Sequence, residues 1–109
     1  MTAGTLGEFE VVILLAVMHT APGAYGSAVR DEITRRSGQV PARGAVYVTL
    51  DRLERKGYLR SAIGGPTPER GGRPRRFYLL SRRGLAALRV SLALVSSMRE
   101  GLDSILDAT

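Results

Sequence analysis

The chain has 109 residues, 44% of them hydrophobic, with a formal net charge of +6 and no cysteine. This composition indicates a single globular domain and excludes a disordered chain, a disulfide scaffold and a thiolate metal site. The longest apolar run, at residues 11–18, is too short to span a membrane, so we expect a soluble protein of the cytoplasm without a cleaved signal.

The first ordered segment is predicted to begin near Leu6 and to run as a helix through EFEVVILLAVMHT, residues 8–20. Glu8 and Glu10 favour a helix N-terminus, where the helix dipole stabilises acidic side chains. The segment is apolar on nearly every side, and a domain this small can hardly cover it alone. We therefore assign Phe9 and Val12 to a dimer interface. A buried strand is the alternative, because the segment contains consecutive β-branched residues.

A turn over residues 21–27 leads into a second helix, which is predicted to begin near Gly26 or Ser27 and to end at Gly38. Residues 37–43 then lead into a third helix, which continues to Gly57. In this third helix Val46, Leu50 and Leu53 recur at the spacing of a core-facing stripe. Two short helices joined by an irregular turn, the second with cations on its outer side, are typical of a helix-turn-helix motif.

The outer side of the third helix combines small residues near its start with cations further along. This arrangement suits a helix in a DNA major groove, with the small and apolar residues on base edges and Arg52, Arg55 and Lys56 on phosphates. The residues assigned to DNA contact on this helix are Arg43, Gly44, Ala45, Tyr47, Val48, Thr49, Arg52, Arg55 and Lys56.

Residues 59–63 and 75–80 read as two strands, joined by a loop rich in Gly and Pro at residues 64–74. Arg70, Arg73 and Arg75 lie in or beside this loop. A hairpin with an arginine-bearing tip directly after a recognition helix predicts a wing that reaches the adjacent groove or phosphates. The alternative is a solvated hairpin tip that binds nothing.

A last helix is predicted over residues 82–108, capped by Ser81. Its apolar residues keep a three-four spacing, interrupted by Arg99, which would pair with an acid across an interface or extend into solvent. We expect residues 1–80 to form the winged domain and residues 81–109 a dimerisation helix. A terminal helix packed only on its own domain is the alternative. The assigned interface residues are Leu85, Leu88, Leu92, Val95, Arg99 and Leu102, with Phe9 and Val12 of the first helix.

The positive charge is concentrated in the middle of the chain. Residues 29–83 carry a net charge of +9, whereas the segments before and after are net acidic. The sequence has one histidine and no catalytic triad, phosphate loop or metal-ligand cluster, so we expect no enzyme, no catalytic residue, no cofactor and no metal. Double-stranded DNA and a second copy of the chain are the expected partners. A small-molecule effector is left open, and its candidate pocket residues are Phe9, Met18, Leu94, Val95 and Met98.

Residues 44–59, GAVYVTLDRLERKGYL, with the Gly-rich loop and residues 70–84, RGGRPRRFYLLSRRG, resemble the PadR family of bacterial transcriptional regulators. Residues 21–33, APGAYGSAVRDEI, are similar to that family's turn and second helix. The resemblance covers residues 6–88. It implies a mainly α-helical winged helix-turn-helix with a two-stranded β wing and a C-terminal dimerisation helix, as in the smaller subgroup of the family.

The resemblance also implies a homodimer, usually a repressor, which would bind an inverted-repeat operator. Tyr47 matches the tyrosine of the family's Gly-Thr-Leu-Tyr-Pro pattern, commonly a contact to the DNA backbone, whereas Ala45, Val46 and Val48 replace its Thr, Leu and Pro. The wing arginines match the family's basic wing. The alternative function is a winged-helix dimer that binds a protein or a small ligand without specific DNA binding.

Overall fold

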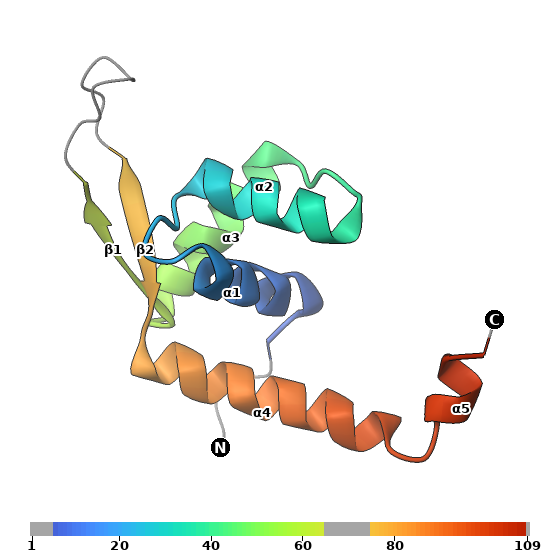
Figure 1. Ribbon diagram of the computed structural model, residues 1–109. Coiled ribbons are helices and arrows are strands. Elements are labelled where there is room, and N and C mark those ends of the chain that lie inside the picture. Colours follow the sequence, from blue (N-terminus) through green and yellow to red (C-terminus); the bar gives the residue numbers. More distant parts are fainter. Residues whose placement is uncertain (1–5, 65–74, 109) are drawn as a thin grey trace.

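The computed structural model describes residues 6–64 and 75–108. Three helices form one group with a hairpin at its side, and a fourth helix runs along α1 and extends beyond it (Figure 1). The arrangement confirms a mainly helical fold with a two-stranded antiparallel wing. In chain order the elements are α1 (Glu8–Thr20), α2 (Gly26–Ser37), α3 (Arg43–Arg55), β1 (Leu59–Ile63), β2 (Arg76–Leu80), α4 (Arg82–Arg99) and α5 (Asp103–Leu106).

The core lies between α1, α2 and α3. The predicted stripe of α3 is confirmed, because Val46, Leu50 and Leu53 are completely buried. Helix α1 is a helix and not a strand, and the Glu10 side chain caps it by accepting a hydrogen bond from the Gly7 amide at 2.9 Å. The other completely or almost completely buried side chains include Ile13, Leu14, Val17, Val29, Leu59 and Leu88.

Two glycines and one arginine set the geometry of the helix-turn-helix. Gly38 ends α2 with φ 76°, and Gly57 follows α3 with φ 83°. Both are in the left-handed region, where glycine avoids the steric cost of a Cβ. Between α2 and α3, the Arg30 Nε atom donates to the Pro41 carbonyl at 2.8 Å. This bond ties the turn to α2, so the turn presents α3 at a defined angle.

The wing is joined to the turn before α2. Strands β1 and β2 pair antiparallel, with Leu59 opposite Leu80 and Ile63 opposite Arg76. On the other side of β2, the Tyr78 amide donates to the Ala24 carbonyl at 2.9 Å. The predicted strands are confirmed, with β2 beginning one residue later than expected. Because β2 bonds to both β1 and the turn, the hairpin is held at a fixed place beside α3.

Helix α4 begins in tight contact with the end of α3. The Ser81 hydroxyl accepts a hydrogen bond from the Gly84 amide at 3.0 Å, which confirms the predicted cap, and donates to the Gly57 carbonyl at 2.6 Å. A Cβ on Gly84 would lie only 2.1 Å from the Tyr58 carbonyl oxygen. The absence of a side chain at Gly84 therefore allows the helix to cross the backbone here.

The prediction of one continuous helix over residues 82–108 is wrong. Helix α4 ends at Arg99, Gly101 has φ 86°, and the short helix α5 follows. A left-handed glycine redirects the chain, and glycine is also a poor residue for a helix interior. Figure 1 shows α5 at the far end of α4, away from the other helices.

Candidate nucleic-acid interface

One side of α3 faces away from the core. Its exposed residues combine three arginines and one acid with small, apolar or aromatic side chains, and Val48 is 57% exposed. The exposed residues of α3 are Arg43, Gly44, Ala45, Tyr47, Val48, Asp51, Arg52 and Arg55. This set includes most of the residues predicted to contact DNA.

Thr49 was expected on this surface and is not there. Its side chain is only 3% exposed and lies beside Leu50 and Val46 in the core. On a helix, position i+3 from Val46 lies on the same side as Val46, so the buried stripe is wider than predicted. Thr49 as arranged here cannot reach a base edge.

Tyr47 is held in place by the first turn of α2. A Cβ on Gly26 would lie 2.3 Å from the Cε1 atom of the Tyr47 ring, so the ring lies directly on the glycine backbone. The Arg43 guanidinium lies 5.8 Å from the centre of the same ring, within the range of a cation–π contact. Tyr47 remains 39% exposed, with its position set by neighbours on both sides.

Two of the predicted phosphate-binding cations instead contact an acid of α1. The Glu10 carboxylate accepts hydrogen bonds from Lys56 Nζ at 2.9 Å and from Arg52 Nε at 3.2 Å. Burial by itself would raise the pKa of Glu10, but the hydrogen bonds from the Gly7 amide, Lys56 and Arg52 outweigh it and lower this pKa. Through these contacts Glu10 links the end of α3 to the start of α1.

Sequence reasoning did not find this role of Glu10. The signal in the sequence was an acid within an otherwise apolar helix. The Glu10 side chain is only 9% exposed, and a buried carboxylate requires charged or hydrogen-bonding partners. Arg55 differs from Arg52 and Lys56, since among residues 6–64 and 75–108 it pairs only with Asp51, at 2.9 Å, and is 72% exposed. Arg55 is therefore the cation at the end of α3 that is most open to a ligand.

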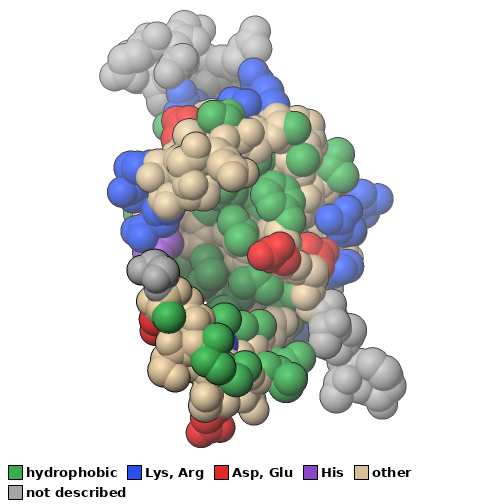
Figure 2. Space-filling model, turned by 90° about the vertical axis from the view of Figure 1, so that its right-hand side faces the viewer, with side chains coloured by type: hydrophobic (Ala, Val, Ile, Leu, Met, Phe, Trp, Pro, Cys, Tyr) green, Lys and Arg blue, Asp and Glu red, His purple; other side chains and the backbone are tan. Residues whose placement is uncertain are grey.

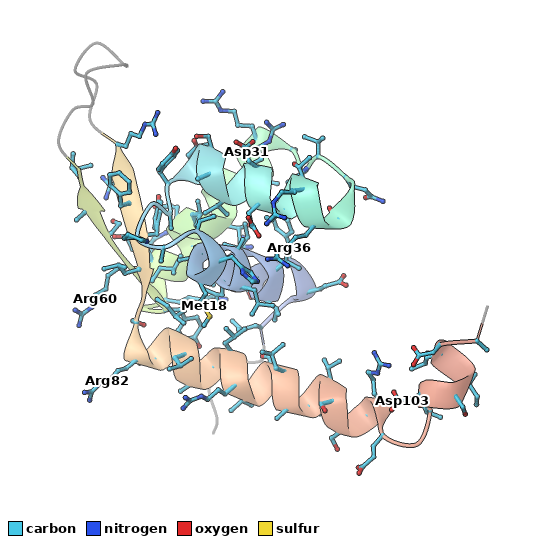
Figure 3. The ribbon with its side chains drawn as sticks, viewed as in Figure 1. Met18, Asp31, Arg36, Arg60, Arg82 and Asp103 are labelled. Carbon is cyan, nitrogen blue, oxygen red and sulfur yellow. The ribbon has the colours of Figure 1, made fainter. Side chains whose placement is uncertain are left out.

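The described part of the wing is rich in arginine. The Arg75 guanidinium lies 4.1 Å from the centre of the Tyr25 ring, and that ring meets Phe77 edge-on at 5.6 Å. Arg76 donates to the Ser61 hydroxyl at 2.8 Å. Arg60 extends outward from β1 (Figure 3). The predicted contacts Arg70 and Arg73 lie outside the described residues.

The predicted dimer-interface residues differ in how exposed they are. Leu92, Val95 and Leu102 are exposed, whereas Phe9, Val12 and Leu85 are half-buried. Leu88 was expected at the interface but is 2% exposed, because it packs into the core of its own chain. That prediction is wrong for Leu88.

Arg99 also has partners within its own chain. Its guanidinium contacts Asp103 at 2.8 Å and Asp107 at 3.7 Å. The break at Gly101 makes both contacts possible, because it turns the acids of the following segment back toward the end of α4. In this arrangement Arg99 does not need an acid from a partner, one of the two roles considered for it.

The predicted effector pocket is assembled only in part. A groove of about 470 Å³ between α1 and α4 includes Leu94 and Val95 in its lining, together with Val12. Phe9 packs against the core, and Met98 is 70% exposed. Met18, 47% exposed, points from α1 toward α4 in Figure 3. The groove is lined by Leu6, Glu8, Val11, Val12, Ser91, Leu92, Leu94 and Val95.

Within residues 6–64 and 75–108, no group of three or more His, Cys, Asp or Glu side chains is arranged to hold a metal ion. No helix in the same ranges is both long and apolar enough to cross a membrane.

Residues 14–90 match the PadR-like family of transcriptional regulators. The chain belongs to this family. The match extends from the middle of α1 into α4, so it includes the helix-turn-helix, the wing and the start of the C-terminal helix. This family regulates transcription, which agrees with the winged helix-turn-helix fold. No curated protein matches the sequence.

Solved structures show the same fold. A PadR-like transcription factor from Bacteroides fragilis is 26% identical, with 89% of this chain and 88% of that chain covered and a TM-score of 0.73. A PadR family regulator from Eggerthella lenta is 25% identical over 93% and 85% of the two chains, with a TM-score of 0.69. One from Clostridium difficile R20291, at 20% identity over 92% and 99%, has a TM-score of 0.73 and supports the fold alone.

Proposed function

We propose that this PadR family member is a homodimeric repressor that binds an inverted-repeat operator, with the α3 helices of two subunits in successive major grooves. The observation that carries this proposal is the exposed side of α3. Gly44, Ala45 and Val48 form a small, apolar surface there, while Arg43 and Arg55 provide charge at its two ends. Such a surface suits close approach to base edges with cations on flanking phosphates.

Each part of the surface has a separate role in this proposal. Val48 contacts a thymine methyl group, because an exposed branched apolar side chain suits that contact. Tyr47 contacts the DNA backbone from its fixed position on Gly26. Arg43, Arg55 and the wing arginines, Arg75 among them, bind phosphates. Arg52 and Lys56 mainly hold α3 to Glu10, and contribute positive charge near the backbone.

The dimer is supported by the exposed side of α4. Large apolar side chains on this helix are exposed to solvent, which is unfavourable for a monomer and typical of a surface covered by a partner. A second copy would cover the groove between α1 and α4 and place its own α3 on the same side of the assembly. The large exposed apolar residues of α4 are Val90, Leu92, Leu94, Val95 and Met98.

The groove between α1 and α4 also supports an effector site. At about 470 Å³ it has the volume of a small-molecule pocket, and its lining is mainly apolar. In the proposed dimer a small apolar ligand held there would alter the angle between the two α3 helices and so release DNA. A regulator of this kind acts where the chromosome lies, so we place the protein in the cytoplasm.

Selection of bound fragments from genomic DNA by the purified protein tests the proposal. We expect a short inverted repeat among the selected fragments. Val48→Ala should change which sequences are selected, whereas Arg55→Ala should weaken binding to all of them. Arg89→Ala is the matched control, because Arg89 is an exposed arginine on α4, away from α3.

Two outcomes would contradict the proposal. Recovery of random fragments by the wild-type protein would show binding without sequence specificity and favour the alternative of a dimer that binds a protein or a small ligand. An equal loss from Arg55→Ala and Arg89→Ala would show that α3 is not the contact surface.

A further inference from the structure

A second groove lies between α1 and α2. Its volume is about 260 Å³. Figure 2 views the end of the molecule near this groove, with hydrophobic side chains in the middle of the face and Arg and Lys side chains along both edges. The groove is lined by Val12, Leu15, Ala16, His19, Glu32, Ile33, Arg36 and Ser37.

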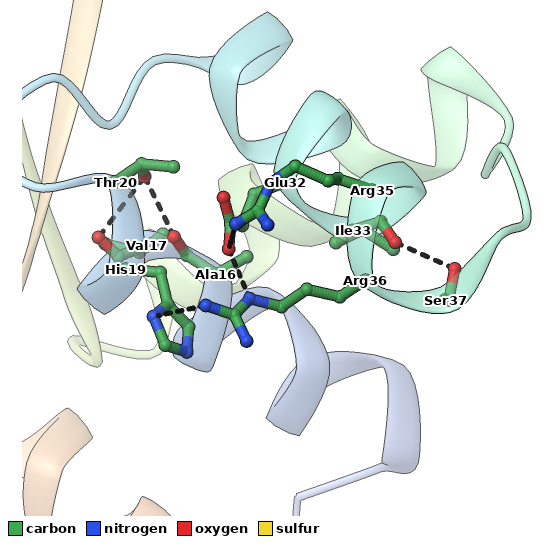
Figure 4. Close-up of polar contacts among 9 residues, drawn as sticks. All are labelled: Ala16, Val17, His19, Thr20, Glu32, Ile33, Arg35, Arg36 and Ser37. Atoms are coloured by element: carbon green, nitrogen blue, oxygen red, sulfur yellow. Dashed lines mark hydrogen bonds and ion pairs between the residues drawn. The ribbon is translucent and has the colours of Figure 1, made fainter.

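One acid and one arginine, Glu32 and Arg36, line this groove, and Arg35 bonds to the same Glu32 beside it. Glu32 accepts hydrogen bonds from Arg35, at 2.7 Å, and from Arg36, and these bonds lower its pKa to about 2. Arg36 also lies 3.3 Å from the Nδ1 atom of His19 (Figure 4). Two guanidinium groups thus share one carboxylate, which leaves an excess of positive charge beside an apolar floor.

The C-terminal segment has the complementary character. Leu102 is 45% exposed, Ile105 71% and Leu106 55%, and no residue of α5 is buried. Figure 2 shows hydrophobic side chains gathered in the lower part of the face, where this segment lies. The acids Asp103 and Asp107 share the single cation Arg99, so the segment carries excess negative charge.

We propose that α5 of one subunit docks into the α1–α2 groove of a second copy of the chain. Ile105 and Leu106 would cover the apolar floor, and Asp103 and Asp107 would face the arginine rim. In Figure 3, Arg36 and Asp103 lie on well-separated parts of one chain, which favours a contact between two chains. A covered apolar floor and paired charges would each stabilise the contact.

Continuity with the proposed dimer supports this occupant, and the inference rests on that dimer. Val12 lines both the α1–α4 groove and the α1–α2 groove, so the two hollows meet at one residue of α1. A partner helix α4 that lies on the first groove would bring its following segment to the second. The chain changes direction at Gly101, and in the proposed contact α5 would cross the partner's α1 toward α2.

Cysteine cross-linking tests the contact, because the sequence contains no cysteine. We would co-express a tagged Ser37→Cys chain with an untagged Ile105→Cys chain and oxidise the purified mixture. Ser37 lines the groove at its edge and is exposed. We expect a mixed disulfide dimer in high yield. Leu79→Cys with Ile105→Cys is the matched control, because Leu79 is 55% exposed on β2, and this pair should cross-link at least about tenfold less.

The outcomes separate this inference from the proposed dimer. A dimer by sedimentation that gives no more mixed cross-link than the control overturns the tail contact and leaves the dimer intact. A monomer overturns both. A double variant, Ser37→Cys with Ile105→Cys in one chain, that cross-links at monomer size would show that α5 folds back on its own groove, and would also overturn the inference.

A second measurement does not depend on disulfide geometry. Ile105→Asp with Leu106→Asp should raise the dimer dissociation constant at least about tenfold, since it puts acids on the apolar floor. Leu79→Asp is the control and should leave the constant unchanged. An unchanged constant for the α5 variant would contradict the contact.

Discussion

The ring of Tyr47 on α3 lies directly on the backbone of Gly26 at the start of α2, where a Cβ would be 2.3 Å from the ring. The first turn of α2 therefore sets the position of an aromatic side chain on the proposed DNA surface. Because the contact is between a ring and a backbone, any side chain at residue 26 must move the ring.

We expect Gly26→Ala to lower both stability and DNA affinity. Overpacking of this kind costs about 1–3 kcal/mol in the free energy of unfolding, measured by urea denaturation. In a Tyr47→Ala background the added methyl group has room, so Gly26→Ala should have a much smaller effect there. Equal effects in both backgrounds would show that Gly26 does not act through Tyr47.

Arg52 and Arg55 should behave differently, although both are arginines of α3. Arg52→Ala should lower the free energy of unfolding by about 1 kcal/mol, because it removes a charged partner of Glu10. Arg55→Ala should change it by less than about 0.5 kcal/mol, because the pair with Asp51 is on the surface. In DNA binding we expect the reverse order. The same order in both assays would refute this division of roles.

The Glu10 contacts predict a particular dependence of stability on pH. The pKa of Glu10 is lowered in the folded state, below the usual 4.5, so its stabilising effect is complete above about pH 4.5 and is lost as the pH falls. The difference in unfolding free energy between wild type and Glu10→Gln should therefore shrink in acid. Glu8→Gln, a change at an exposed acid on the same helix, is the control. A difference that grows below pH 4.5 would contradict the assigned contacts.

Two helical glycines should respond oppositely to alanine. A Cβ on Gly44 would meet nothing within 4 Å, so Gly44→Ala should stabilise the fold by up to about 1 kcal/mol through helix propensity. A Cβ on Gly84 would lie 2.1 Å from the Tyr58 carbonyl oxygen, so Gly84→Ala should lower the midpoint of thermal unfolding sharply. Calorimetry on both variants tests the pair. A Gly84→Ala protein as stable as wild type would show that α4 does not cross the backbone so closely.

Local patterns in the sequence predicted most of the fold. The stripe of Val46, Leu50 and Leu53, the stops at Gly38 and Gly57, and the cap at Ser81 are confirmed, because each depends on residues only a few positions apart. The family resemblance is confirmed as well.

Features that depend on distant residues were predicted less well. Thr49 and Leu88 are buried because α3 and α4 pack against other elements of the fold. The spacing of apolar residues along one helix does not show which other elements will cover it. Glu10 bonds to Arg52 and Lys56, more than forty positions away, and no local pattern indicates that contact. The break between α4 and α5 was not predicted, because apolar residues continue at helical spacing on both sides of Gly101. In the structure Gly101 has φ 86°, and α4 ends just before it.

The central claim is that the cationic surface around α3 and the wing binds the phosphates of specific DNA. Its most direct test is the affinity of the purified protein for a selected genomic fragment between about 50 and 200 mM salt, measured by fluorescence anisotropy. If the dimer neutralises about six to ten phosphates, affinity should fall by about 10³ or more across this range. An affinity that stays constant across the range would contradict the claim.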